Sequence, residues 1–244
     1  MVNAAVMGIL APVRYVLLSD ALIDAMTPQQ VEAVFGHEAG HVRHRHIPHF
    51  LAFALVGWLV VVAIMELLAR WTSDAGGANG WSPTAIESAG VLTAVGFWGI
   101  GFGWVSRRFE RQADLFGARC AAPVTARDCT VPCSVHPDDA TTLGDDGGLC
   151  ATGAMVFASA LQRVAALNGI PVDERSWRHA SIRNRIDFLV SAADDPRRLR
   201  RFERIVRRVQ RLIWAAAIAG VGALAWYGSV VPQPAVLRIT AGQS

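Results

Sequence analysis

The chain has 244 residues and a formal net charge of +3, and 52% of its residues are hydrophobic. Its mean hydropathy of +0.32 is high for a soluble domain, which argues against an ordinary soluble protein. So small a net charge gives no reason to expect a nucleic-acid partner.

The N-terminal part of the chain carries signals for a strand followed by a helix. Residues 13–18 (VRYVLL) are β-branched and aliphatic, which predicts a short strand. A helix start follows, with Thr27 as the cap, Pro28 at the first helical position and Gln30 three residues after the cap. We therefore expect a helix from Pro28, with apolar residues at helical spacing forming its buried face.

This predicted helix carries the sequence His37-Glu38-Ala39-Gly40-His41, an HExxH motif. Residues four apart lie on one face of a helix, so His37 and His41 can share a metal ion, and the spacing suits zinc. Glu38 is rotated away from that face and can take a proton from a water on the metal. A catalytic zinc needs three protein ligands, so the third must come from elsewhere in the chain.

Three mostly apolar runs, at residues 50–69, 85–106 and 212–231, are each long enough to cross a bilayer core. The chain has no lysine, and 21 of its 23 arginines lie in residues 1–49 and 107–211. By the positive-inside rule, we expect a multi-pass protein of a cell's inner membrane, with the HExxH motif facing the cytoplasm.

The second apolar run continues without a helix breaker into a segment with two carboxylates on one face, Glu110 and Asp114. Because a hairpin of two adjacent crossings brings their cytoplasmic ends together, Glu110 is the candidate third zinc ligand, on the same side as His41. Asp114 is one turn farther on, where it can accept a hydrogen bond from a histidine's non-ligating nitrogen. The alternative for both carboxylates is a solvated helix face paired with arginine.

The residues that follow, 119–150, form a cysteine-containing insertion that is rich in Pro, Gly, Asp and Thr and is expected to be a loop. The insertion also contains His136, and its cysteines are Cys120, Cys129, Cys133 and Cys150. Their spacing matches no standard zinc module. A small structural zinc site, a redox or disulfide role and unliganded thiols therefore all stay open.

Helical spacing returns after the insertion, at residues 151–167, and a further helix is capped by Asp194-Asp195-Pro196. Its first part, residues 196–211, is basic and amphipathic. We expect this part to lie along the inner membrane surface before the chain crosses the membrane at residues 212–231.

Four patches of the sequence resemble, in the same order, the integral-membrane zinc endopeptidases related to the heat-shock protease HtpX and the CAAX-prenyl endopeptidases. They are Asn3-Ala4, residues 13–46, SRRFERQAD at residues 106–114 and HASIRNRI at residues 179–186. The resemblance implies a mainly α (α+β) fold, in which a gluzincin-like zinc protease domain with a short β-sheet is fused to transmembrane helices. In the implied division, residues 1–49 form the strand and HExxH helix, and residues 50–106 form a transmembrane hairpin. Residues 107–195 form the rest of the protease domain with its insertion. A basic amphipathic helix (196–211) and a C-terminal transmembrane helix (212–231) follow.

The resemblance also assigns roles to the site residues. It implies that His37, His41 and Glu110 hold Zn²⁺ and that Glu38 is the general base. His179 and Arg185 match the family's downstream His and Arg, which flank the cleft and help to bind substrate or stabilise the oxyanion. This chain has Ala180 where the family usually has Pro, and a surface histidine on a basic helix is the alternative for His179.

The expected function is a zinc endopeptidase that hydrolyses membrane or unfolded proteins on the cytosolic side, for quality control or processing. Its partners would be polypeptide substrates and the lipid bilayer, with no oligomeric state indicated. Family members generally have membrane helices before the Asn-Ala patch, so we expect a fragment or a short form. The alternative function is a catalytically impaired, protease-like membrane scaffold or sensor.

Overall fold

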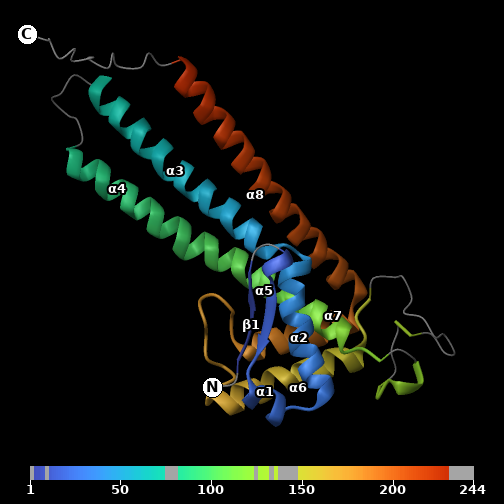
Figure 1. Ribbon diagram of the computed structural model, residues 1–244. Helices are drawn as coiled ribbons and strands as arrows, with labels where there is room; N and C mark the ends of the chain where they lie inside the picture. Colours follow the sequence, from blue (N-terminus) through green and yellow to red (C-terminus); the bar gives the residue numbers. More distant parts are fainter. Residues whose placement is uncertain are drawn as a thin grey trace, which may run out of the picture.

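A computed structural model of the chain describes residues 3–8, 11–74, 82–123, 126–131, 135–136 and 148–230. Figure 1 shows three long helices that extend from one end of a helical domain: α3 (His46–Asp74), α4 (Pro83–Gly96) and α8 (Pro196–Val230). The domain contains β1 (Ala4–Met7), β2 (Tyr15–Leu18), α1 (Asp20–Ala25), α2 (Pro28–Arg43), α5 (Gly103–Cys120), α6 (Ala151–Asn168) and α7 (Ile182–Asp194). The fold is mainly helical, with a single two-stranded sheet among the described residues.

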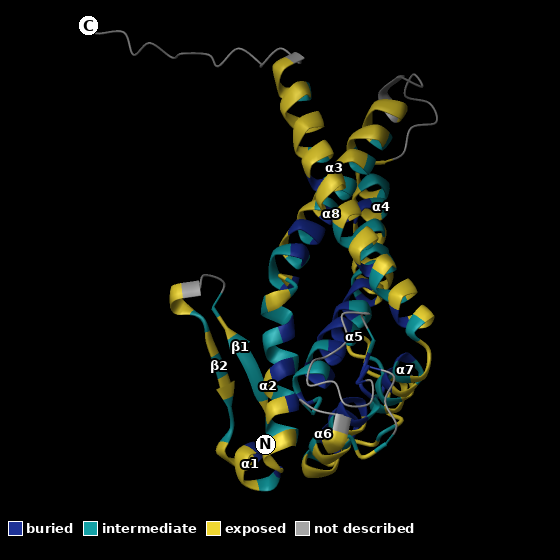
Figure 2. Ribbon diagram, turned by 90° about the vertical axis from the view of Figure 1, so that its right-hand side faces the viewer, coloured by how far each residue is buried: buried dark blue, intermediate teal, exposed yellow. Residues whose placement is uncertain are grey.

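The sheet is an antiparallel hairpin, in which Ala4 pairs with Leu18 and Met7 with Tyr15. The strand expected at residues 13–18 starts two residues later, because Val13 belongs to a short 3-10 helix (Ala11–Val13) whose backbone conformation suits the fixed φ of its proline. Figure 2 shows the hairpin beside α2, and β1 is the strand nearer to that helix.

The HExxH helix, α2, begins at Pro28 as predicted, with a complete capping box. The backbone N–H of Gln30 donates to the Thr27 hydroxyl (3.3 Å), and the backbone N–H of Thr27 donates to the Gln30 side chain (3.1 Å). The helix packs closely on α5 because small residues face each other there. A Cβ added at Gly40 would lie 3.1 Å from the Cα of Ala113, and one at Gly117 would lie 2.7 Å from a backbone oxygen of α2. This close crossing brings the HExxH motif next to the carboxylates of α5.

The second apolar run leads into the domain as one continuous helix. After α4, the segment Phe97–Phe102 is π-helical, and α5 follows without a break. Trp177, in the loop before α7, donates a hydrogen bond from its indole Nε1 to the Gly99 carbonyl (2.7 Å). This bond satisfies a carbonyl in the segment where the α-helical hydrogen-bond pattern shifts.

Among the residues that the structure describes, three helices are long and apolar enough to cross a membrane: His46–Trp71, Pro83–Cys120 and Pro196–Ser229. In the most apolar 18-residue stretch of each helix, only 17%, 17% and 11% of the residues are buried inside the protein, so these apolar stretches are largely left uncovered by the rest of the chain. Figure 2 shows the same pattern as exposed residues along the three helices. Such surfaces suit lipid, and the chain is a membrane protein.

The amphipathic part of α8 differs from the expectation. Residues 196–211 are not a separate surface helix but the first half of the continuous α8. Leu199 and Val206 on its apolar face are completely buried against the domain, in clusters that also contain Leu189 and Phe109. An apolar stripe at helical spacing fits protein or lipid equally well, and here it packs on protein.

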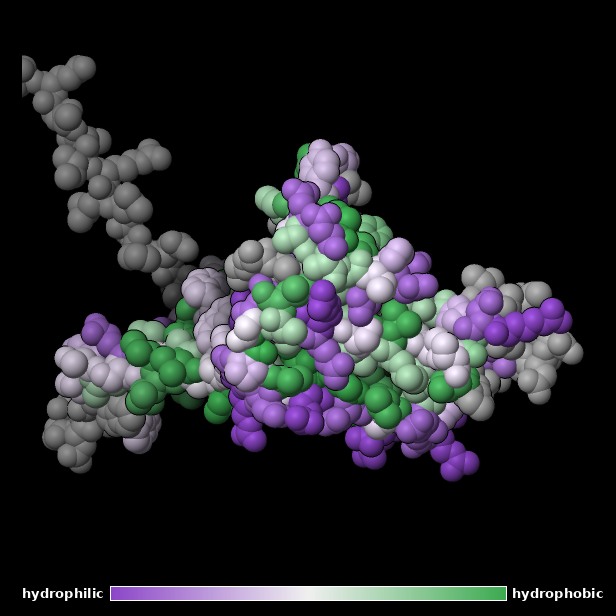
Figure 3. All heavy atoms as spheres, turned by 90° about the horizontal axis from the view of Figure 1, so that it is seen from below, coloured by the Kyte–Doolittle hydropathy of each residue, from purple (hydrophilic) through white to green (hydrophobic). Residues whose placement is uncertain are grey.

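Helix α6 ends at Gly169, which adopts a left-handed conformation (φ 66°) as the expected helix stop. The described parts of the insertion at 119–150 contain one 3-10 turn, Ala126–Asp128. Cys133 lies outside the described residues. Figure 3, viewed from the end of the domain opposite the long helices, shows hydrophilic and hydrophobic residues interspersed, which is typical of a surface that faces water.

Candidate metal centre and active site

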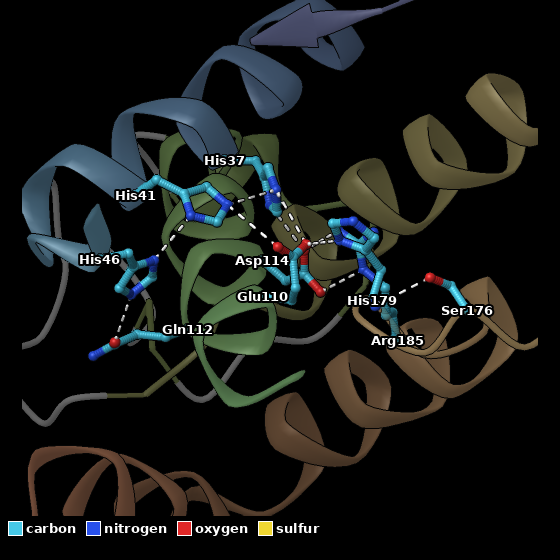
Figure 4. Close-up of polar contacts among 9 residues, drawn as sticks. All are labelled: His37, His41, His46, Glu110, Gln112, Asp114, Ser176, His179 and Arg185. Atoms are coloured by element: carbon cyan, nitrogen blue, oxygen red, sulfur yellow. Dashed lines mark hydrogen bonds and ion pairs between the residues drawn. The ribbon is translucent and has the colours of Figure 1, made fainter. Parts of the chain in front are cut away.

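Three candidate zinc ligands converge where α2 crosses α5 (Figure 4). The Nε2 atoms of His37 and His41 lie 3.2 Å apart. Oε2 of Glu110 lies 3.8 Å from Nε2 of His37, and Oε1 of Glu110 lies 3.7 Å from Nε2 of His41. Helical spacing on α2 and the close approach of α5 therefore bring the expected set of residues together.

This donor set fits a zinc ion. With zinc–ligand bonds of about 2.0–2.2 Å in a tetrahedron, neighbouring ligand atoms lie about 3.4 Å apart. The three measured separations of 3.2, 3.7 and 3.8 Å are close to that value. Burial also lowers the pKa of His41 to about 4, because desolvation disfavours the imidazolium ion, so the ring has the neutral form that binds metals.

Asp114 lies at Nδ1 of His37, on the other side of the ring from the candidate metal-binding Nε2, and Arg185 binds Asp114. Asp114 is completely buried, and its Oδ1 lies 2.9 Å from Nδ1 of His37, in close contact but not aligned for a hydrogen bond. Arg185, on α7, donates from Nε to Oδ2 of Asp114 at 2.9 Å and from Nη2 to Oδ1. Burial works against the charge of Arg185, but the carboxylate of Asp114 raises the pKa of its guanidinium above the ordinary value, so the pair stays ionised.

His41 is held in a similar way by His46 and Gln112, two residues that the sequence does not predict to take part. Its Nδ1 lies 2.9 Å from Nδ1 of the fully buried His46, whose Nε2 lies 3.0 Å from the side-chain oxygen of Gln112. If Nε2 of His41 faces a metal, its Nδ1–H donates to His46, which in turn donates from Nε2–H to Gln112. His46 also stacks on Phe109, with ring centroids 4.4 Å apart. The only sequence signal was a histidine five residues after the motif.

Glu38 lies beside the three ligands at a cavity of about 250 Å³, which is also lined by His179 and Arg185. The pKa of Glu38 is raised, chiefly because burial disfavours its charged form. The carboxylate of Glu110 raises this pKa further, and a hydrogen bond from the backbone of Val6 in β1 partly opposes the shift. A carboxylate with a raised pKa is suited to accepting and returning a proton near neutral pH.

His179 reaches the centre from the loop before α7. Its Nδ1 lies 3.0 Å from Oε2 of Glu110, and 46% of its side chain is exposed. His179 precedes α7 and so does not lie on a helix, and its ring contacts the candidate ligand Glu110 while remaining exposed. Its neighbour Ala180 has φ 63°, in the left-handed region, a conformation that proline cannot adopt.

Comparison with known proteins gives one result. Residues 1–135 match the family model described as Peptidase family M48. This segment contains the HExxH motif, Glu110 and Asp114, whereas His179 and Arg185 lie beyond it. No curated protein and no solved structure matches the chain.

Proposed function

The chain belongs to peptidase family M48, and from this membership we propose that it is a zinc-dependent endopeptidase acting on membrane or unfolded proteins at the cytosolic face of a cell's inner membrane. The family makes the chain a metallopeptidase, and its three apolar helices make it a membrane protein. The identity of the metal, the catalytic residues, the substrates and the side of the membrane are parts of the proposal.

One observation carries the proposal: His37, His41 and Glu110 surround a single point beside a cavity that Glu38 also lines. The donor set would hold zinc, which polarises a peptide carbonyl and lowers the pKa of a water molecule. Two neutral imidazoles and one carboxylate leave the ion a net positive charge for this purpose.

Glu38 is the proposed proton carrier. Its raised pKa fits a group that takes a proton from the attacking water and then delivers it to the leaving amine nitrogen. His179 is half exposed at the same cavity, so its ring is the proposed hydrogen-bond donor to the substrate's carbonyl oxygen. Arg185 already uses Nε and Nη2 on Asp114, and we therefore assign it a positioning role, through Asp114 and His37.

The cavity supports a peptide as the substrate. Its apolar wall is formed by α6, with Phe157, Leu161 and Val164 facing the space next to Glu38. A volume of about 250 Å³ fits one side chain of an extended peptide whose backbone passes the proposed zinc site. Because the domain lies directly at the end of α3 and α8, segments near the membrane surface are within its reach (Figure 1).

Replacing Glu38 tests the catalytic part of the proposal. The full chain, purified in detergent and loaded with zinc, is assayed for cleavage of an unfolded protein such as casein. Glu38→Gln should lower the cleavage rate at least about 100-fold while zinc content is unchanged. The matched control is Glu32→Gln, an exposed change on the same helix, which should retain activity. Equal activity of both variants would exclude Glu38 as the proton carrier.

A separate experiment tests the side of the membrane. The arginine distribution puts the domain in the cytoplasm and the far end of α8 outside. Alkaline phosphatase, which is active only after export, should therefore be active when fused after Ser229 and inactive when fused before Asn3. The reverse pattern would place the active site outside the cytoplasm.

A further inference from the structure

A second group of metal-binding side chains lies in the insertion, away from the HExxH motif. Cys129, His136 and Cys150 come from three separate points of the chain, and one ligand atom of each lies within 4.8 Å of the other two. His136 is 3% exposed and Cys150 is 1% exposed. Two of the three side chains are therefore buried, and the third, Cys129, is partly exposed.

The two distances from Cys129 to the other members of the cluster match those around a tetrahedral zinc ion. With Zn–S bonds of about 2.3 Å and Zn–N bonds of about 2.0 Å, two sulfur ligands lie about 3.8 Å apart and a sulfur and a nitrogen about 3.5 Å apart. The Sγ atoms of Cys129 and Cys150 are 3.8 Å apart, and Sγ of Cys129 lies 3.3 Å from Nδ1 of His136. A disulfide between these two cysteines would need an S–S distance near 2.0 Å.

The surroundings of the cluster favour a cation. Nδ1 of His136 faces sulfur, which is a weak hydrogen-bonding partner, and its buried Nε2 has no hydrogen-bond partner among the described residues. Burying an imidazole with so few hydrogen bonds costs free energy, unless a stronger interaction such as a bond to a metal ion compensates. Cys150 is the N-cap of α6, so its side chain lies at the start of that helix, next to the other two ligands.

The backbone holds the three ligands in this position. The backbone N–H of Thr130, next to Cys129, donates to the Thr152 hydroxyl on α6 at 3.0 Å. Gly148 lies so close to Val135 that an added Cβ would be 2.5 Å from its side chain. These contacts hold the segment at residues 135–136 and the one at 129–131 against the start of α6.

We propose that Cys129, His136 and Cys150 bind a second, structural zinc ion that fastens the insertion to the N-terminus of α6. The site is distinct from the His37–His41–Glu110 centre, which contains no sulfur. It acts on that centre through α6, because Phe157 stacks on His37 with ring centroids 5.8 Å apart. The proposal does not depend on peptidase activity.

Cobalt substitution tests the site without an activity assay. The full chain in detergent is stripped of metal by a chelator under reducing conditions and then titrated with Co²⁺. We expect a near-ultraviolet thiolate-to-cobalt charge-transfer band, which the sulfur-free His37–His41–Glu110 centre cannot produce. Absence of the band in the wild-type chain would overturn the proposal, even if every cysteine variant failed to fold.

Single substitutions show which residues give rise to the charge-transfer band and which of the two sites holds each zinc ion. Cys129→Ser should reduce the band at least about two-fold and lower zinc from about two ions per chain to about one. The matched control Cys120→Ser should change neither, because Cys120 lies outside the cluster. His41→Ala should also remove one zinc ion but leave the band intact. A band of undiminished intensity in Cys129→Ser, or a Cys129–Cys150 disulfide found by mass spectrometry of the zinc-loaded chain, would contradict the site.

Discussion

Arg185 donates a hydrogen bond from Nε to Oδ2 of Asp114 at 2.9 Å, joining residues 71 positions apart in the sequence. The other oxygen of Asp114 contacts His37, so α7, α5 and the HExxH helix meet at one buried carboxylate. Because this carboxylate is completely buried, its charge depends on the guanidinium of Arg185 for compensation. The orientation of His37 therefore depends on a residue of α7.

Removing Arg185 should destabilise the domain strongly. Arg185→Ala leaves the buried charge of Asp114 without its partner, which costs about 3–5 kcal/mol of unfolding free energy. The matched control is Arg183→Ala on the same helix, whose ion pair with Asp173 is exposed and should contribute little. Thermal melting of the purified chain in detergent measures both. Similar melting temperatures for the two variants would show that the buried pair has no such role.

Glu110→Ala should remove the zinc ion of the proposed catalytic centre. The carboxylate is the one anionic member of the candidate donor set, so its loss takes away both a ligand and charge compensation. Zinc affinity, measured by competition with a chromophoric chelator, should fall at least about 100-fold. Glu203→Ala is the control, because Glu203 pairs with Arg119 at 2.8 Å on a different part of the domain. Unchanged affinity in Glu110→Ala would exclude it as a ligand.

Much of the candidate metal centre could be predicted, because most of the residues that define it lie close together in the sequence. The spacing of His37 and His41 fixes one helix face, and the capping box at Thr27 fixes where that helix begins. Glu110 required one further step, that two adjacent membrane crossings return to the same side. Each of these inferences uses a helical period and a charge pattern, which a single sequence displays.

Other features depend on contacts between distant segments, and the sequence does not display those. Nothing in the spacing of His46 and Gln112 indicates that they meet across 66 positions. The apolar face of residues 196–211 fits a membrane surface as well as a protein partner, because periodicity does not distinguish the two. Likewise, Trp177 gave no signal that it would bond to the π-helical segment of the second crossing. Tertiary packing decided all three.

His46 should tune the metal affinity of His41. With a metal on Nε2 of His41, the His46 ring accepts the hydrogen bond from Nδ1–H of His41, and outer contacts of this kind are worth about 10–100-fold in affinity. His46→Ala should therefore weaken zinc binding by that factor, as measured by chelator competition. His44→Ala is the control, since His44 is partly exposed and contacts His46 only by stacking at 5.8 Å. Equal losses in the two variants would point to general disruption of the helix junction.

Ala180 is held in a conformation that alanine adopts at a cost, so glycine should stabilise the chain there. At φ 63° the Cβ costs about 1–2 kcal/mol, while Ala→Gly loses about 0.4–1 kcal/mol through the unfolded state. The balance favours Ala180→Gly by about 0.5–1 kcal/mol. The control Ala166→Gly, at an exposed position in the last turn of α6, should instead lower stability by up to about 1 kcal/mol.

Ala180→Pro should have the opposite effect on the same loop. Proline is confined to negative φ and removes the N–H that Ala180 donates to the Ser176 carbonyl at 3.0 Å. The loop must then change shape, which moves His179 away from Glu110. We expect a lower melting temperature and a loss of peptide cleavage in Ala180→Pro, both measured beside Ala180→Gly. A proline variant as stable and active as the glycine variant would show that the left-handed conformation is not required to position His179.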